Sequence, residues 1–232
     1  MESATQKIRL QRSESLLVGS LLALVGGFLD AYTYLSRGKV FANAQTGNMV
    51  LLGVRLCERD WAGALGYLVP ILAFALGVLV AEWIRRRRAQ ERFHWRQSVL
   101  LIEIAILIPI GFVPDGAANP YVNTAVSFVC ALQVQAFRTM HNLAYATTMC
   151  TGNLRSGTER LGQYLVTRER AALSDALKYY AVIVLFIAGA AVGVVATSSL
   201  SEPAVWLPAG VLMLVFLLLF ERPIRAVEAE SD

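Results

Sequence analysis

Six apolar runs constrain this chain more than any other feature of its sequence. Each run is long enough, or nearly so, to cross a hydrocarbon core, which takes roughly 20 helical residues. The chain therefore predicts an all-α integral membrane protein with about six transmembrane helices. The predicted spans are Leu16 to Leu35, Leu65 to Ile84, Ser98 to Val113, Val122 to Arg138, Tyr179 to Thr197, and Val205 to Phe220.

The composition agrees with a chain embedded in a lipid bilayer. Only 16% of the residues are charged and the mean hydropathy is +0.53, whereas a soluble domain carries roughly 25% charged residues. The net charge of +4 comes from clusters beside the apolar runs, which indicates a topology signal and not a nucleic-acid-binding surface. A single membrane domain over 1–232 is expected, with polar tails at 1–15 and 221–232.

Two short stretches of the chain are copies of one another. Phe41 to Asn48 reads FANAQTGN, and Ala146 to Asn153 reads ATTMCTGN. The two Thr-Gly-Asn triplets lie 105 residues apart, as do the ends of the apolar runs before them. A matched triplet with a matched upstream run indicates an internal duplication. The repeat halves are predicted at 16–113 and 122–220.

Basic residues in the short loops predict the orientation in the membrane, because Lys and Arg accumulate on the cytoplasmic side. With the amino terminus inside, the four arginines Arg85 to Arg88 and the basic stretch Arg155 to Lys178 also fall inside. The loops Pro114 to Pro120 and Ser198 to Pro203 hold no Lys or Arg and fall outside. Both termini are then cytoplasmic. One basic group opposes this orientation: Arg37, Lys39, Arg55 and Arg59.

Three spans in each half is an odd number, so the two halves must insert in opposite orientations. The Thr-Gly-Asn segments would then enter the bilayer from opposite faces. A full extra span over Val40 to Leu56 would force the four-arginine loop outside, against the positive-inside preference. A 3+3 inverted repeat with a re-entrant or broken helix at each triplet is therefore predicted, and eight full spans is the alternative.

The two segments carry polar side chains at membrane depth, where only protein contacts or a water-filled cavity can satisfy them. We expect paired half-helices that present amides, hydroxyls and backbone groups to a small polar solute. The alternative is that Thr and Asn only cap helix ends in interfacial loops. The candidate substrate-binding residues of the segments are Asn43, Gln45, Thr46, Gly47, Asn48, Asn142, Thr148, Thr151, Gly152 and Asn153.

Asp30 is a further candidate, because an ionisable group inside a span is costly unless it is paired or functional. It lies on the order of 20 Å along the first span at 1.5 Å per residue. The alternative is a structural salt bridge to Arg37, Lys39 or Arg138. The repeat partner of Asp30 is the neutral Gln135, so a charge function is not symmetric. Gln133, Gln135 and Arg138 complete the candidate set, and intramembrane Gln often joins helices.

Other features predict packing. Glu82 and Arg86 stand at i,i+4 spacing, which favours a surface ion pair. Small-residue stripes at four-residue spacing let helices approach closely within the bundle or between protomers, so a homo-oligomer is left open. The stripes are Gly19-Ala23-Gly27, Ala73-Gly77-Ala81 and Gly189-Gly193.

No enzymatic or metal-binding motif accompanies these features. The chain has no nucleophile elbow, zinc-protease motif, phosphate loop or dinucleotide fingerprint in a suitable context. Its three cysteines include no CxxC pair, and His94 and His141 stand alone, so neither a disulfide framework nor a metal site is indicated. We expect no catalytic residues, no cofactor and no enzyme.

The segment Gly27 to Tyr32, followed by Val40 to Asn48, resembles the YoaK-like family of bacterial membrane proteins. The likeness runs from about Leu16 to Phe220 and includes Gln133, Arg138 and the second triplet. The resemblance implies a multi-span protein of the bacterial inner membrane and supplies no substrate.

Two hypotheses of function follow from the residues. The leading one is a small secondary transporter or channel-like carrier, with Asp30 as a proton-linked or cation-attracting group. The competing hypothesis is a non-transporting sensor or assembly partner whose cytoplasmic arginines bind anionic lipid or protein.

Overall fold

The structure, a computed structural model, describes residues 12–87, 95–140 and 143–220 of the chain. The polar tails before Arg12 and after Phe220, together with Arg88 and Asn142, lie outside the described residues. The fold is all-α apart from one small hairpin, as predicted. The helices are α1 (Leu16–Ser36), α2 (Gln45–Cys57), α3 (Trp61–Arg87), α4 (Trp95–Ile110), α5 (Asn119–Ala136), α6 (Cys150–Thr167), α7 (Arg170–Leu200) and α8 (Trp206–Leu218), with 3-10 turns η1 (Arg12–Glu14) and η2 (Glu202–Val205) and strands β1 (Thr139–Met140) and β2 (Leu143–Ala144).

Within the described residues, three helices are long and apolar enough to cross a membrane: α1, α3 and α7. The other three predicted spans coincide with α4, α5 and α8, which have 16, 18 and 13 residues. One side of α3 leaves Leu65, Leu72, Leu76 and Leu79 more than half exposed. A continuous exposed apolar face of this kind fits contact with lipid.

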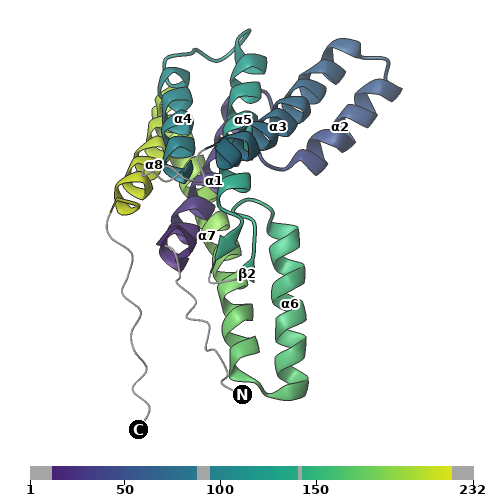
Figure 1. The fold of residues 1–232 in the computed structure, drawn as a ribbon. Coiled ribbons are helices and arrows are strands. Elements are labelled where there is room, and N and C mark those ends of the chain that lie inside the picture. The colour runs from purple at the N-terminus through teal and green to yellow at the C-terminus, as the bar shows by residue number, and fades with distance from the viewer. Residues whose placement is uncertain (1–11, 88–94, 141–142, 221–232) are drawn as a thin grey trace.

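Two helix pairs form the centre of the molecule: α1 packs along α7, and α3 packs along α5 (Figure 1). Small residues permit the close approach. A Cβ at Gly27 would collide with the carbonyl oxygen of Phe186, one at Gly189 with that of Leu24, and one at Gly77 with that of Phe128. The close packing predicted from the small-residue stripes is therefore confirmed within one chain.

Alanine at Gly189 is expected to destabilise the protein by about 2 kcal/mol, because the new methyl group meets backbone and not a movable side chain. Gly210→Ala is the matched control, since a Cβ there meets open space and alanine favours the helix. Thermal unfolding in detergent should show a lower Tm for Gly189→Ala and an unchanged or higher Tm for Gly210→Ala. Equal Tm values for the two variants would contradict the close contact.

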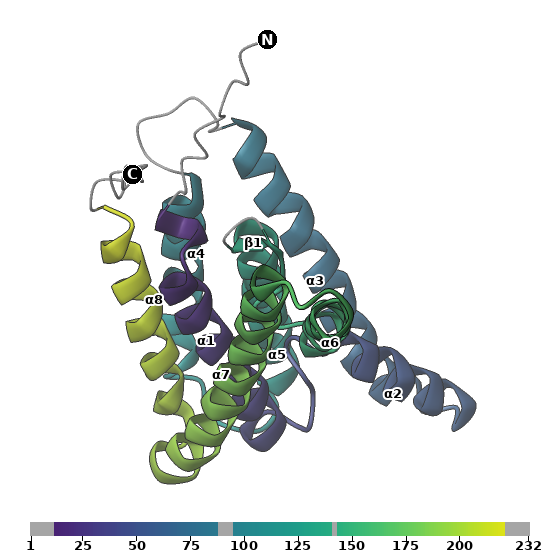
Figure 2. The same cartoon turned by 90° about the horizontal axis from the view of Figure 1, so that it is seen from below.

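The largest helix contacts are the same when the two halves of the chain are exchanged. α1 against α7 corresponds to α5 against α3, and α2 against α3 corresponds to α6 against α7. α4 against α5 corresponds to α8 against α1, while α4 and α8 contact each other (Figure 2). The duplicated sequence is thus matched by a duplicated set of helix contacts.

Hydrogen bonds show which helix ends lie together at each of the two ends of the helix bundle. Near the start of α4, the Arg96 guanidinium donates to Ser13 Oγ at 2.7 Å and to the Ala136 carbonyl at 2.9 Å. At the other end, Tyr32 donates to the Glu202 carbonyl at 3.1 Å, and the Asp115 N–H donates to the Glu202 carboxylate at 3.0 Å. The two loops without Lys or Arg therefore contact each other at the end where α1 finishes.

The predicted ion pair near the end of α3 is confirmed. Glu82 lies 2.9 Å from Arg86 Nε and 2.6 Å from Arg85 Nη2. Gln135 of α5 also donates to Glu82 at 3.1 Å. This candidate glutamine therefore joins two helices.

Candidate functional site

After α1 ends, the chain doubles back along the helix that it has just left. The Asn43 N–H donates to Asp30 Oδ1 at 2.7 Å, and the Asn43 side chain donates to the Gly26 carbonyl at 3.0 Å. Gly26 lies about 15 Å before the end of α1 at 1.5 Å per residue. The chain then turns outward again as α2, which at 13 residues is too short to cross a bilayer alone.

Each copied segment is closed by the same reciprocal pair of hydrogen bonds. Asn48 accepts from the Phe41 N–H at 3.3 Å and donates to the Phe41 carbonyl at 2.7 Å. Asn153 accepts from the Ala146 N–H at 3.2 Å and donates to the Ala146 carbonyl at 2.6 Å. Both asparagines are buried. They hold their own loops and do not line the pocket described next.

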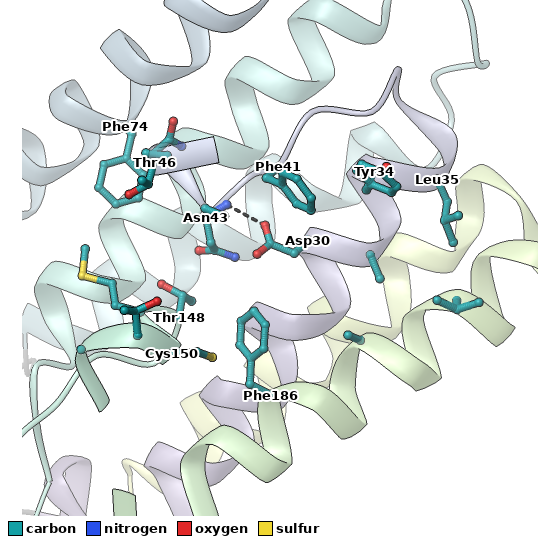
Figure 3. Close-up of a pocket in the computed structure, with 18 residues that line it drawn as sticks. Asp30, Tyr34, Leu35, Phe41, Asn43, Thr46, Phe74, Thr148, Cys150 and Phe186 are labelled. Atoms are coloured by element: carbon teal, nitrogen blue, oxygen red, sulfur yellow. Dashed lines mark hydrogen bonds between the residues drawn. The ribbon is translucent and has the colours of Figure 1, made fainter. Parts of the chain in front are cut away.

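One pocket of about 830 Å³ is lined by both copies. The first segment contributes Asn43, Gln45 and Thr46, and the second contributes Thr148, Thr151 and Gly152 (Figure 3). α1, α3 and α7 supply the remaining walls. The structure therefore brings parts of both Thr-Gly-Asn segments to one cavity, although they are far apart in the sequence.

Several polar groups at this pocket have no hydrogen-bond partner among the described residues. Thr148 Oγ1 and Asn43 Oδ1 are both buried and unpaired. Helices α2 and α6 both begin here, and neither Ala44 nor Met149 gives its helix a side-chain cap. The first N–H groups of a helix lack intrahelical acceptors. The pocket thus offers two helix amino ends to a solute, while the unpaired hydroxyl and amide oxygen belong to lining residues but are themselves covered by other atoms.

Asp30 is the one charged residue among the described residues that line the pocket. It is 7% exposed. The predicted alternative of a salt bridge is wrong for Arg37, whose guanidinium instead donates to the Tyr32 hydroxyl at 2.6 Å. No ion pair joins Asp30 to Lys39 or Arg138 in the described part of the chain. The carboxylate is held by a backbone N–H and faces the cavity (Figure 3).

Four aromatic side chains that line the pocket were not predicted as site residues. They are Tyr34 of α1, Phe41 of the returning loop, Phe74 of α3 and Phe186 of α7 (Figure 3). The sequence places three of them in or beside apolar spans, where an aromatic ring is ordinary core material. Only Phe41 carried a signal, because it opens the first copied segment.

The other predicted site residues lie away from the pocket. Gln133 donates to the Leu22 carbonyl at 3.0 Å and to Thr147 Oγ1 at 3.2 Å, so it joins α1 and α5. Gln135 contacts Glu82, as described above. Gly47 and Arg138 are not among the lining residues. These four residues were predicted to bind the solute, and none of them lines this pocket.

Comparisons with known proteins place the whole membrane region in one family. The family described as "Protein of unknown function (DUF1275)" matches residues 18–218. The chain is 26% identical over 197 residues to the UPF0700 transmembrane protein YoaK of Bacillus subtilis (strain 168), covering 82% of this chain and 87% of that protein. No solved structure matches. The apolar helices and this relative together identify a membrane protein.

Proposed function

The chain belongs to the DUF1275 family of proteins of unknown function, and from its own residues we propose that it is a membrane carrier, or a channel-like carrier, for a small solute. The observation that carries this proposal is the pocket lined by both copied segments. A solute site formed where two repeats meet, at the ends of broken helices, is the arrangement found in many secondary transporters.

The helix directions support an inverted repeat. In the first half, α1 runs toward the end of the molecule where Tyr32 contacts Glu202. α2 leaves the pocket toward that same end (Figure 1). In the second half, α5 starts at that end and finishes beside Arg96. α6 then leaves the pocket toward the beginning of α7. We propose six crossings with opposed halves, both termini cytoplasmic, in a bacterial inner membrane.

The competing proposal is a sensor or assembly partner that binds anionic lipid or protein through its cytoplasmic arginines. Arg86 and Arg87 are available for this, as they are exposed at the end of α3. A partner protein has no need for a cavity with unpaired polar groups, which is why we favour the carrier.

The native Cys150 can test the carrier, because it lines the pocket. In a carrier, a membrane-impermeant thiol reagent should modify Cys150 from either face of the membrane, because the pocket opens to each side in turn. The measurement uses right-side-out and inside-out vesicles of a Cys57→Ser variant. Cys130 is fully buried and serves as the unreactive reference.

Two side markers calibrate the vesicle orientations, each in its own Cys150→Ser variant: native Cys57 in one, and Gly162→Cys with Cys57→Ser in the other. Cys57 is exposed at the end of α2, and Gly162, on α6, is its repeat equivalent 105 residues later. A Cβ at Gly162 meets open space, so Gly162→Cys should be tolerated. The inverted repeat predicts that the two positions react from opposite faces. Reaction of Cys150 from one face only would refute the carrier, and reaction of both markers from one face would refute the inversion.

A further inference from the structure

We propose that the pocket takes a monovalent organic cation, a class of solute that rests on the proposed carrier function. The cavity joins one carboxylate to a wall of aromatic rings, and no Lys, Arg or His is among its described lining residues. This combination favours a positive charge on an apolar body.

The charge argument starts from Asp30. Its carboxylate points into the cavity from the last third of α1 (Figure 3) and has no cationic partner within 4.0 Å among the described residues. A buried carboxylate without a counter-ion is costly. A bound cation would supply the missing charge.

The aromatic argument concerns the four rings that line the same cavity as Asp30. The faces of Tyr, Phe and Trp carry negative electrostatic potential and attract cations. One of these rings already attracts a cation of the chain: Lys39, which does not line the cavity, has its Nζ 4.7 Å from the centroid of the Tyr34 ring. Tyr34 in turn stacks on Phe41 with a centroid separation of 4.8 Å. Phe74 and Phe186 lie further inside the cavity (Figure 3).

The size and polarity of the cavity exclude a simple inorganic cation as the best occupant. About 830 Å³ is far more than one dehydrated ion fills, and hard cations need six or more oxygen ligands. The described residues contain no group of three or more acidic, His or Cys side chains able to hold a metal. An organic ion can cover the apolar walls while its charge meets Asp30.

The two helix amino ends oppose this assignment, because they favour anions. One of them already serves Asp30, since Asn43, just before α2, donates its N–H to that carboxylate. The start of α6 has no such acidic neighbour in its first turn. The sign of the preferred charge is therefore a decisive measurement.

Three probes of the same shape test the sign. They are choline, its uncharged isostere with a tert-butyl group in place of trimethylammonium, and the tert-butylacetate anion. Thermal unfolding of the purified full chain in detergent should show a rise in Tm with choline alone, because a ligand of the folded state raises apparent stability. Titration of this shift gives the affinity.

Variants assign the choline effect to the pocket. Asp30→Asn keeps the acceptor for Asn43 and should weaken choline binding roughly tenfold or more, while Phe186→Leu should weaken it several-fold. The controls are Glu159→Gln and Tyr121→Leu, at exposed residues that do not line the pocket. Both controls should bind choline as the wild type does.

The outcomes separate the two proposals. Stronger stabilisation by tert-butylacetate, or equal stabilisation by the uncharged isostere, would overturn the cation site. If Asp30→Asn does not fold, the wild-type probe series and Phe186→Leu still decide. Choline binding without choline uptake into proteoliposomes would support the cation site and refute the carrier. Uptake of tert-butylacetate above the level of protein-free vesicles, without choline binding, would support the carrier and refute the cation site.

Discussion

Alanine at Asn48 or at Asn153 is expected to lower the free energy of unfolding by about 3 kcal/mol. Each side chain satisfies the N–H and the carbonyl of one loop residue, Phe41 or Ala146. Removal of the amide leaves two polar backbone groups without these partners, and each unsatisfied buried group costs roughly 1–3 kcal/mol. Thermal and chemical unfolding in detergent would measure the loss.

The control for this pair is Gln163→Ala. Gln163 is an exposed amide of α6 that also makes two side-chain hydrogen bonds, at 3.1 and 3.3 Å, but water can replace them. It should change stability by less than about 0.5 kcal/mol. The two asparagines sit in separate segments, so their effects should add in the double variant. Wild-type stability of Asn48→Ala or Asn153→Ala would show that the reciprocal bonds do not hold the loops.

These asparagines also show where inference from sequence stops. The Thr-Gly-Asn triplets predicted two equivalent polar segments, and the structure places Thr46, Thr151 and Gly152 of the triplets at one pocket. The pattern could not tell a residue that faces the cavity from one that turns back to its own loop. That difference depends on the backbone direction within one turn of helix, which a triplet does not encode.

The long-range neighbours of Asp30 were equally beyond the sequence. Asp30 was expected to meet either a solute or an arginine, whereas its recorded hydrogen bond comes from the backbone of Asn43. Almost every residue type has a backbone N–H, so the amino-acid sequence does not indicate which residue donates to Asp30. Phe186, on the other hand, reaches the pocket because α7 crosses α1 at its glycines, and the stripes predicted close crossings without naming the partner helix.

The membrane class and the helical fold were predictable because apolar length and small-residue spacing act locally. The spans at α4 and α8 were predicted for the same reason, whereas the full length of α6 was not. A half-helix was predicted at the second triplet, but α6 runs from Cys150 to Thr167, into the region from Arg155 onward that was predicted only as a cytoplasmic basic stretch. Its helical state comes from packing on α7, where Gly157 lies against Tyr179.

Tryptophan at Thr46 or Thr151 is expected to stop transport while the protein still folds. The two threonines are repeat equivalents, 105 residues apart, and both line the pocket with exposed side chains. An indole ring attached at either position would fill cavity space and would not displace packed core atoms. Uptake of choline into proteoliposomes should fall to the level of protein-free vesicles for both variants.

The matched control is Gly53→Trp, which places the same ring on α2 where a Cβ meets open space, away from the pocket. It should insert, fold and transport as the wild type does, with circular dichroism and Tm as checks on folding. A blocked shared cavity requires that either half alone can stop uptake, because both copies face one solute. If Thr46→Trp abolished uptake and Thr151→Trp did not, only the first segment would face the solute path, and a common site for both halves would be refuted.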